Sequence, residues 1–392
     1  MGRCTPSLSV DSQDAHRWVG AVLGAIAAAA VTALGWRLAR RAESRSRIVA
    51  AGAAGLLFAV NPIVAGAAPS LMAEALILPV AALVLLVTDR LVTGDGHGWD
   101  VAALGALLVV GALTRSEAVV VLGAAVVGGW FVARRAHTPA RSWVLALSVG
   151  VVAVVAWSVV ISVASERPVL VSTNSGSLLL GANCRETRTA DGIGYWAVDC
   201  LAVPRDAVSD ETARRIAAQE RFLARHFALP PQIGAPGEAD VNRAQFDAAT
   251  DEIANHPFDT LAAVPMRWLR GLGLYWSPLQ DRQEAFEGRD HSWEVAGRWF
   301  NIVLVLPFAL VTLCGVLFRR SRLRSRLGNV VEVHRLVPSL ALIGAWLVTI
   351  ALSYGSARFR AVVEPSSAVL AGLGYALAAQ WVAQRGRRSV AS

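Results

Sequence analysis

Several residue patterns that would point directly to a function are missing from this chain of 392 residues. It has no lysine, so all 37 of its basic residues are arginine, a bias that a GC-rich genome explains. Its seven histidines show no paired spacing, so we expect no metal cluster from spacing. We also find no Ser-His-Asp arrangement, phosphate-cradling glycine loop or nucleic-acid motif. The function therefore has to be inferred from composition and from the position of a few polar residues.

Charged residues are also scarce, and apolar residues dominate the composition. Hydrophobic residues make up 55% of the chain, and the mean hydropathy is +0.48. Together with repeated apolar runs near the length of a membrane crossing, this predicts an all-α polytopic membrane protein. The net charge of +8 does not indicate nucleic-acid binding, because the arginine clusters lie beside the apolar runs, where they set topology.

The apolar runs predict about nine membrane segments. The two segments around 101–132 are short for full crossings and form a pair interrupted by Thr114–Glu117. The chain accordingly divides into N-terminal membrane segments (1–164), a loop region with helices (165–297) and C-terminal membrane segments (298–392). We expect the nine segments near residues 18–36, 48–65, 71–91, 101–113, 118–132, 143–164, 299–318, 336–353 and 362–382.

The distribution of arginine predicts the orientation of these segments. With nine crossings, the arginine-rich links 37–47, 134–141 and 319–335 and the C-terminal tail all fall on one side, which the positive-inside rule makes cytoplasmic. The N-terminus and the long loop then lie outside. We see no cleavable signal peptide ahead of the first apolar run. The expected location is the cytoplasmic (plasma) membrane, with contacts to its lipids.

This orientation gathers five charged residues at the outer face: Glu74, Arg115, Glu117, Arg358 and Arg360. Charged groups at span ends are costly unless they are paired or hydrated, and they often mark a functional site. Arginines there can hold a phosphate at the level of the lipid headgroups. Each residue also has a simpler explanation. Arg115 and Glu117 can form a salt bridge at a helix turn, Glu74 can favour a helix N-terminus, and Arg358 and Arg360 can extend toward water from a span end.

The loop region offers side chains that suit a carbohydrate. The amides of Asn174 and Asn183 can bond to hydroxyl groups, and the rings of Tyr195 and Trp196 can stack on a sugar. We also predict helices over 210–227, from about residue 240, and over 256–276.

Two cysteines, Cys184 and Cys200, bracket part of the loop. If the loop is extracytoplasmic they can form a disulfide, and the alternative is two unrelated thiols.

Five stretches of the sequence resemble a known superfamily in the order expected for it. They cover most of the chain and are AHRWVGAVLG, NPIVAGAAPSLMAEALILP, GALLVVGALTRSEAVVVLGAAVVGGW, VSTNSGSLLLGANCRETRTADGIGYWAVDC and LSYGSARFRAVVEPSSAVLAGLG. The series resembles the GT-C superfamily of membrane glycosyltransferases, in particular bacterial proteins similar to protein mannosyltransferases (glycosyltransferase family 39). The resemblance implies a GT-C-like bundle that transfers a sugar from a polyprenyl-phosphate carrier to an extracytoplasmic protein, lipid or glycan.

The resemblance also assigns roles to individual residues. It implies that Arg115, Arg358 and Arg360 face the carrier phosphate and that Glu117, with the loop residues above, contacts sugar or acceptor. The family's catalytic carboxylate, usually an Asp in the first outer loop, has no match, because this chain resembles the family only after that loop. Asp11 and Asp14 do not match it either, so Glu74 is the remaining candidate for the general base. Family members often bind a divalent cation near that loop.

Two other classes of function remain open at this stage. A transporter or flippase for a lipid-linked sugar would need polar residues near the middle of the membrane. A non-catalytic membrane subunit would be consistent with the missing Asp.

Overall fold

The structure, a computed structural model, describes residues 10–67, 73–115, 117–134, 139–188, 192–201, 238–277, 280, 291–318 and 321–391. Every regular element within these ranges is a helix. The chain divides into two compact units. The first unit comprises Met1–Leu147, Gly288–Ala345 and Arg360–Ser392, and the second comprises Ser148–Glu287 and Trp346–Phe359.

In the described part of the chain, six helical stretches are long and apolar enough to cross a membrane, so the chain is a multi-pass membrane protein. The expectation of an all-α membrane protein is confirmed for the described residues. The six stretches are Arg17–Leu38, Glu74–Thr93, Ala140–Ala164, His291–Leu317, Val333–Leu352 and Arg358–Arg385.

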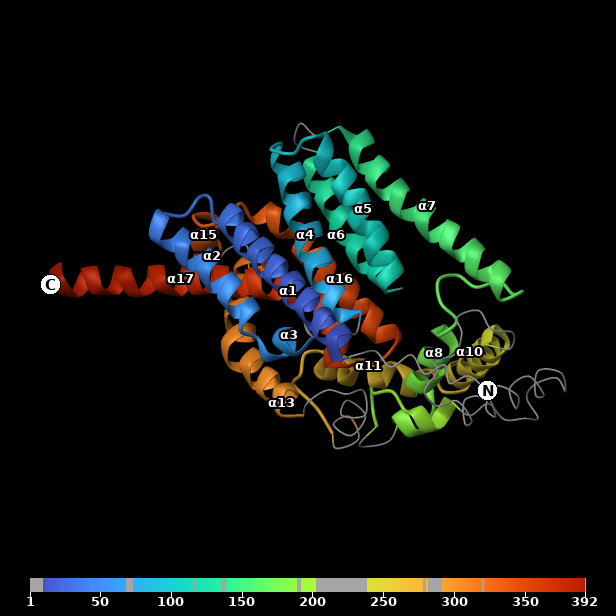
Figure 1. The fold of residues 1–392 in the computed structure, drawn as a ribbon. Helices are drawn as coiled ribbons and strands as arrows, with labels where there is room; N and C mark the ends of the chain where they lie inside the picture. Colours follow the sequence, from blue (N-terminus) through green and yellow to red (C-terminus); the bar gives the residue numbers. More distant parts are fainter. Residues whose placement is uncertain are drawn as a thin grey trace. The chain divides into compact units, whose positions relative to one another are not determined.

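The first unit contains most of the apolar helices (Figure 1). They are α1 (Val10–Leu38), α2 (Ser44–Ala59), α3 (Pro62–Ala67), α4 (Glu74–Thr93), α5 (Gly98–Thr114), α6 (Ala118–Ala133), α13 (His291–Phe300), η4 (Asn301–Val305), α14 (Leu306–Leu317), α15 (Arg322–Gly328), η5 (Val333–Leu336) and α17 (Glu364–Ala391). Helices α7 (Ala140–Ala164) and α16 (Val337–Leu352) contribute residues to both units.

Three of the expected segments are shorter than a full crossing. The pair around Arg115 forms α5 and α6, which are short apolar helices on either side of an extended residue. Helix α2 ends at Ala59, although the sequence pattern extends to residue 65. It ends there because Pro62 has no N–H to donate and disfavours helical backbone at Asn61. The Asn61 Oδ1 instead accepts from the backbone N–H of Ile63, inside the first turn of α3.

Small residues allow the helices of the first unit to pack closely. Helix α2 packs against both α1 and α17, and α4 packs against α1, α5 and α6 (Figure 1). A Cβ atom added at Gly372 of α17 would lie 2.4 Å from the backbone oxygen of Ala50 in α2. Without a driving force from water, such close contacts are a main source of stability between membrane helices.

One end of the first unit is held by a buried ionic group, the Asp89 cluster, which consists of Arg37, Asp89 and Arg335. The Arg335 guanidinium donates to both carboxylate oxygens of Asp89, at 2.6 Å and 2.7 Å. The Nε of Arg37 donates to Asp89 Oδ2 at 2.8 Å. Asp89 and Arg335 are each almost completely buried. The cluster therefore ties the C-terminal end of α1, the last turns of α4 and the start of the Val333–Leu352 span together.

The arginine-rich links meet at this same end. Arg40 and Arg41 donate to Glu332 at 2.8 Å and 3.2 Å, which joins link 37–47 to link 319–335. Burial alone would raise the pKa of Glu332, but hydrogen bonding and attraction from Arg40 and Arg41 hold it below its usual range. The two links that the sequence places on one side of the membrane are thus in contact with each other.

Removing the charge of Asp89 should strongly destabilise the first unit. Asp89→Asn leaves the buried Arg335 without its counter-ion, and breaking a buried pair in this way costs about 3–5 kcal/mol. We expect a marked drop in the temperature of half-unfolding, measured on the purified protein in lipid nanodiscs.

The matched control is Asp95→Asn, which removes a carboxylate bonded to the same Arg37 at 2.8 Å. The Asp95 side chain is 57% exposed, so its ion pair should contribute less than about 1 kcal/mol. Equal losses of stability in the two variants would contradict the role given to the Asp89 cluster.

Candidate functional site

At the opposite end of α4, three charged residues predicted from the sequence come together. Glu74 begins α4, Arg115 follows α5 and Glu117 precedes α6. Arg115 donates from Nη1 to Glu74 at 2.7 Å and from Nε to Glu117. Helix α4 rises about 22 Å between Glu74 and Asp89, so this group and the Asp89 cluster lie near opposite ends of the helix.

The chemistry of this group is set by two carboxylates sharing one guanidinium. Because Arg115 already binds two carboxylates, its guanidinium is less suited to holding a phosphate than the sequence suggests. The side chain of Glu74 is 2% exposed and that of Glu117 is 18% exposed. The structure therefore contains the salt bridge at a helix turn that the sequence leaves as an alternative, and solvent reaches Glu117 more readily than Glu74.

These carboxylates do not form a divalent-cation site as they stand. Such a cation needs several oxygen ligands, and both carboxylates already accept from Arg115.

A second buried polar group in the first unit contains only one residue predicted from the sequence, Arg360. Arg360 in η6 (Ala357–Val363) pairs with Glu364 in the first turn of α17. The amide of Asn61 donates to Glu364 at 3.3 Å and to Asn301 at 3.5 Å. All four side chains are nearly inaccessible to solvent. The signal that could have revealed Asn61, Asn301 and Glu364 is a polar residue within or next to an apolar run, where burial demands a partner.

Both polar groups of the first unit lie toward the same ends of its helices. A short turn joins α1 to α2 beside the Asp89 cluster, so α2 runs back along α1. Asn61 follows the C-terminal end of α2 and therefore lies far from the cluster. Glu74 also lies away from it. The first unit thus has an arginine-rich end and a second end with buried, mixed charges.

Arg358, the other predicted phosphate ligand, belongs to the second unit. It lies in η6 and is partly buried, and its backbone N–H donates to Ser356 Oγ at 3.2 Å.

The second unit contains the described part of the long loop. Its helices are α8 (Ser175–Asn183), η1 (Arg185–Arg188), η2 (Val198–Leu201), α10 (Glu238–Asn255) and α11 (Pro257–Gly271). The last two confirm the helices predicted from about residue 240 and within 256–276. The helix predicted over 210–227 lies outside the described residues.

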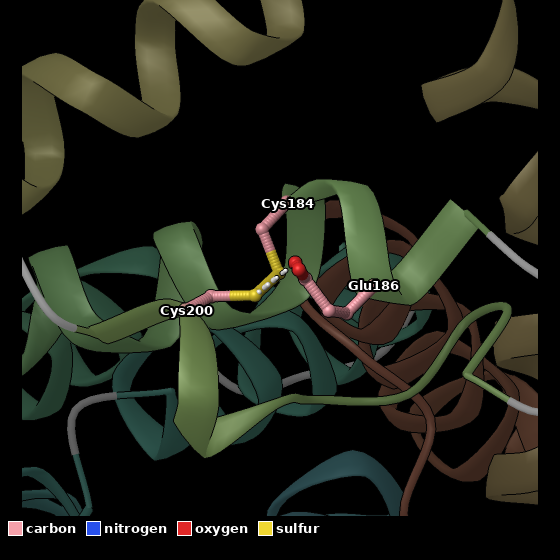
Figure 2. Close-up of side chains that lie close together, drawn as sticks. All are labelled: Cys184, Glu186 and Cys200. Carbon is pink, nitrogen blue, oxygen red and sulfur yellow. Dashed lines mark hydrogen bonds between the residues drawn. A yellow bond between two sulfur atoms is a disulfide. The ribbon is translucent and has the colours of Figure 1, made fainter.

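Cys184 and Cys200 form a disulfide with an S–S distance of 2.06 Å. The carboxylate of Glu186 points at the bond, with Oε2 2.7 Å from the Cys200 sulfur (Figure 2). These three side chains are close enough together to hold a metal ion. They do not fit one in this state, because metal binding needs thiolates and both sulfurs are used by the disulfide.

Tyr195 and Trp196, predicted to stack on a sugar, pack instead within the second unit. Tyr195 is 5% exposed and contacts Tyr354 edge-on, with 6.1 Å between ring centroids. Trp196 stacks against the same Tyr354, and its Nε1 donates to the backbone oxygen of Ser177. The Arg270 guanidinium lies 5.3 Å from the centre of the Tyr195 ring. These contacts make the aromatic pair part of the core of the unit.

Asn183 is likewise buried and occupied. Its Oδ1 accepts from Arg267 at 2.8 Å, and its Nδ2 donates to the backbone oxygen of Leu179 at 2.8 Å. Arg267 is 1% exposed, and this burial lowers the pKa of its guanidinium to about 10. Of the four loop residues predicted to contact a sugar, only Asn174 is exposed, at the start of α8.

Comparison of the chain with protein-family models, with curated proteins and with solved structures finds no match.

The disulfide makes a direct prediction for thiol labelling. In a variant in which Cys4 and Cys314 are replaced by Ser, a membrane-impermeant maleimide should add nothing to intact cells before reduction. After treatment with an impermeant phosphine it should add twice, once at Cys184 and once at Cys200.

A further Cys184→Ser change in the same background leaves one thiol and should give one addition without reduction. The variant should also lose about 3 kcal/mol of stability in the second unit, because the bond constrains the unfolded loop. Labelling at both cysteines without a reductant would contradict the bond.

Proposed function

We propose that this chain is a membrane glycosyltransferase of GT-C architecture, with about nine membrane segments and its loop region outside the cell. It transfers a sugar from a polyprenyl-phosphate carrier to an extracytoplasmic protein, lipid or glycan. The observation that carries the proposal is the concentration of buried polar groups at the arginine-poor end of the first unit. Ionisable residues buried in membrane segments are rarely retained without a function. The five stretches that resemble the superfamily include six of the seven members of these groups: Asn61, Glu74, Arg115, Glu117, Arg360 and Glu364.

In the proposed reaction, an acceptor hydroxyl attacks the anomeric carbon of the donor, and the bond from that carbon to the carrier phosphate breaks. The phosphate leaves with the bonding electron pair, and we propose that Arg358 stabilises its charge. A carboxylate takes the hydroxyl proton, for which we propose Glu74. Glu117, the more exposed of the two carboxylates bound to Arg115, contacts the acceptor.

The positions of the charges favour an enzyme over a transporter of lipid-linked sugars. Every Asp, Glu, Arg and His in the six spans lies within about two helical turns of a span end. A transporter typically binds its substrate near the middle of the membrane, using polar groups or unwound helices there. Groups at a span end instead suit a reaction at the membrane surface.

Arg358→Ala tests the proposal. We expect donor cleavage by the protein in lipid nanodiscs, measured as polyprenyl phosphate released from radiolabelled polyprenyl-phosphate mannose or glucose, to fall about 100-fold or more. Arg358→Lys should retain part of the activity, because it keeps the positive charge.

Arg45→Ala is the control, since Arg45 is exposed on the arginine-rich link 37–47 and should not affect the rate. Full activity in Arg358→Ala would remove the phosphate role from this residue. An inactive wild-type protein across these donors and membrane-extract acceptors would favour a non-catalytic membrane subunit.

A further inference from the structure

The second unit contains a cavity of about 750 Å³ that none of the predicted site residues lines. It lies between the end of α7 at Ser162, the following stretch 167–172, the start of α8 at Ser175 and the first half of α10. The volume is within the range of small-molecule sites, roughly 300–1,000 Å³. Because α7 is a candidate membrane span, the cavity lies just beyond the point where the chain leaves the span.

The walls of the cavity are held in place by packing and hydrogen bonds. Ile161, Val169 and Ala239 form a buried hydrophobic cluster, and Val169 and Ala239 also line the cavity. The backbone N–H of Gly176 donates to Asn242 Oδ1 at 2.6 Å. A Cβ at Gly176 would lie 2.0 Å from the backbone oxygen of Asn242, so α8 and α10 are in direct contact. A ligand would therefore enter a site that is already formed.

The surface of the cavity combines an aromatic ring with hydrogen-bonding groups. Phe246 lines it and is 46% exposed, so part of its ring is accessible to a ligand. Asn242 lies one helical turn away, and because its Oδ1 accepts from Gly176 and Ser175, its Nδ2 remains to donate to a ligand. A sugar presents both a face of C–H groups that packs on a ring and hydroxyls that accept from an amide.

The charges around the cavity balance, which argues against an anionic ligand. The lining includes two arginines and two aspartates. Arg167 pairs with Asp240 at 2.9 Å, and Arg243 lies 3.7 Å from Asp247. A phosphate would need a surplus of positive charge, and neither arginine supplies one while its carboxylate is beside it.

We propose that this cavity binds a neutral sugar residue of a glycan, with Phe246 as the stacking surface and Asn242 as a hydrogen-bond donor. This deepens the proposed function, on which it rests, by naming a neutral glycan as the acceptor held beside the membrane. It also replaces Tyr195 and Trp196, which pack on Tyr354, as the aromatic contact for the sugar.

The test measures binding and does not depend on transfer. The full chain is placed in lipid nanodiscs, because glycosidic detergents could occupy the site, and saturation-transfer NMR is recorded with methyl mannoside, methyl glucoside and methyl galactoside. At least one hexoside should bind. Phe246→Leu keeps an apolar side chain but removes the ring, and it should weaken binding by between about twofold and tenfold.

Phe258→Ala is the control, because Phe258 is 83% exposed on α11 and does not line the cavity. It should leave binding unchanged. Binding that is weakened by Phe246→Leu but not by Phe258→Ala supports the proposal. If the protein also shows no donor cleavage, only the proposed enzymatic role is lost. Active donor cleavage without hexoside binding would overturn the cavity proposal alone. Displacement of the hexoside by inorganic phosphate, or equal weakening in both variants, would also overturn it.

Discussion

The constraint on which this structure depends is that a charge buried among membrane helices must have a partner. The Asp89 cluster meets this constraint at one end of the first unit, where two guanidiniums bind one carboxylate. Each residue of the cluster comes from a different part of the sequence, so the pairing also fixes which helices lie next to each other. Desolvation makes such a group costly to assemble and far more costly to leave half-formed. The cluster therefore specifies the arrangement of the helices more than it adds net stability.

The same constraint gives the two ends of the first unit different chemistry. At the arginine-rich end, cations outnumber the carboxylates that bind them, as Arg37 and Arg335 do around Asp89. At the other end the balance is reversed around Arg115, which is shared by Glu74 and Glu117. A surplus of positive charge favours the cytoplasmic side of a membrane, whereas a carboxylate is the kind of group that general-base chemistry needs. The difference between the ends is what connects the topology to a proposed reaction.

Sequence patterns predict the helical, membrane-spanning character well, because apolar composition and length decide it directly. They also predict that Glu74, Arg115 and Glu117 lie at the same face, because the positions of the spans put these residues at three helix ends. They do not reveal that Asn61 and Asn301 join Glu364, since these residues are far apart in the sequence and only packing makes them neighbours. Nor can they tell that Tyr195 and Asn183 are buried, because an aromatic ring or an amide looks the same in a sequence whether it faces a sugar or a protein core.

Whether the aromatic and amide side chains of the loop region face a sugar or a protein core determines what this region does. Its most distinctive stretch, between Ser172 and Cys200, supplies the disulfide, the aromatic packing and the Asn183–Arg267 contact, all of which hold the second unit together. A residue whose hydrogen bonds are already made inside the protein has little left to offer a ligand. The exposed ring of Phe246 and the free amide donor of Asn242 lie instead on α10, a helix with an ordinary polar sequence. In the proposed arrangement, stability and recognition are carried by different segments, because exposure and unused hydrogen-bonding capacity, more than an unusual sequence, decide where a ligand can bind.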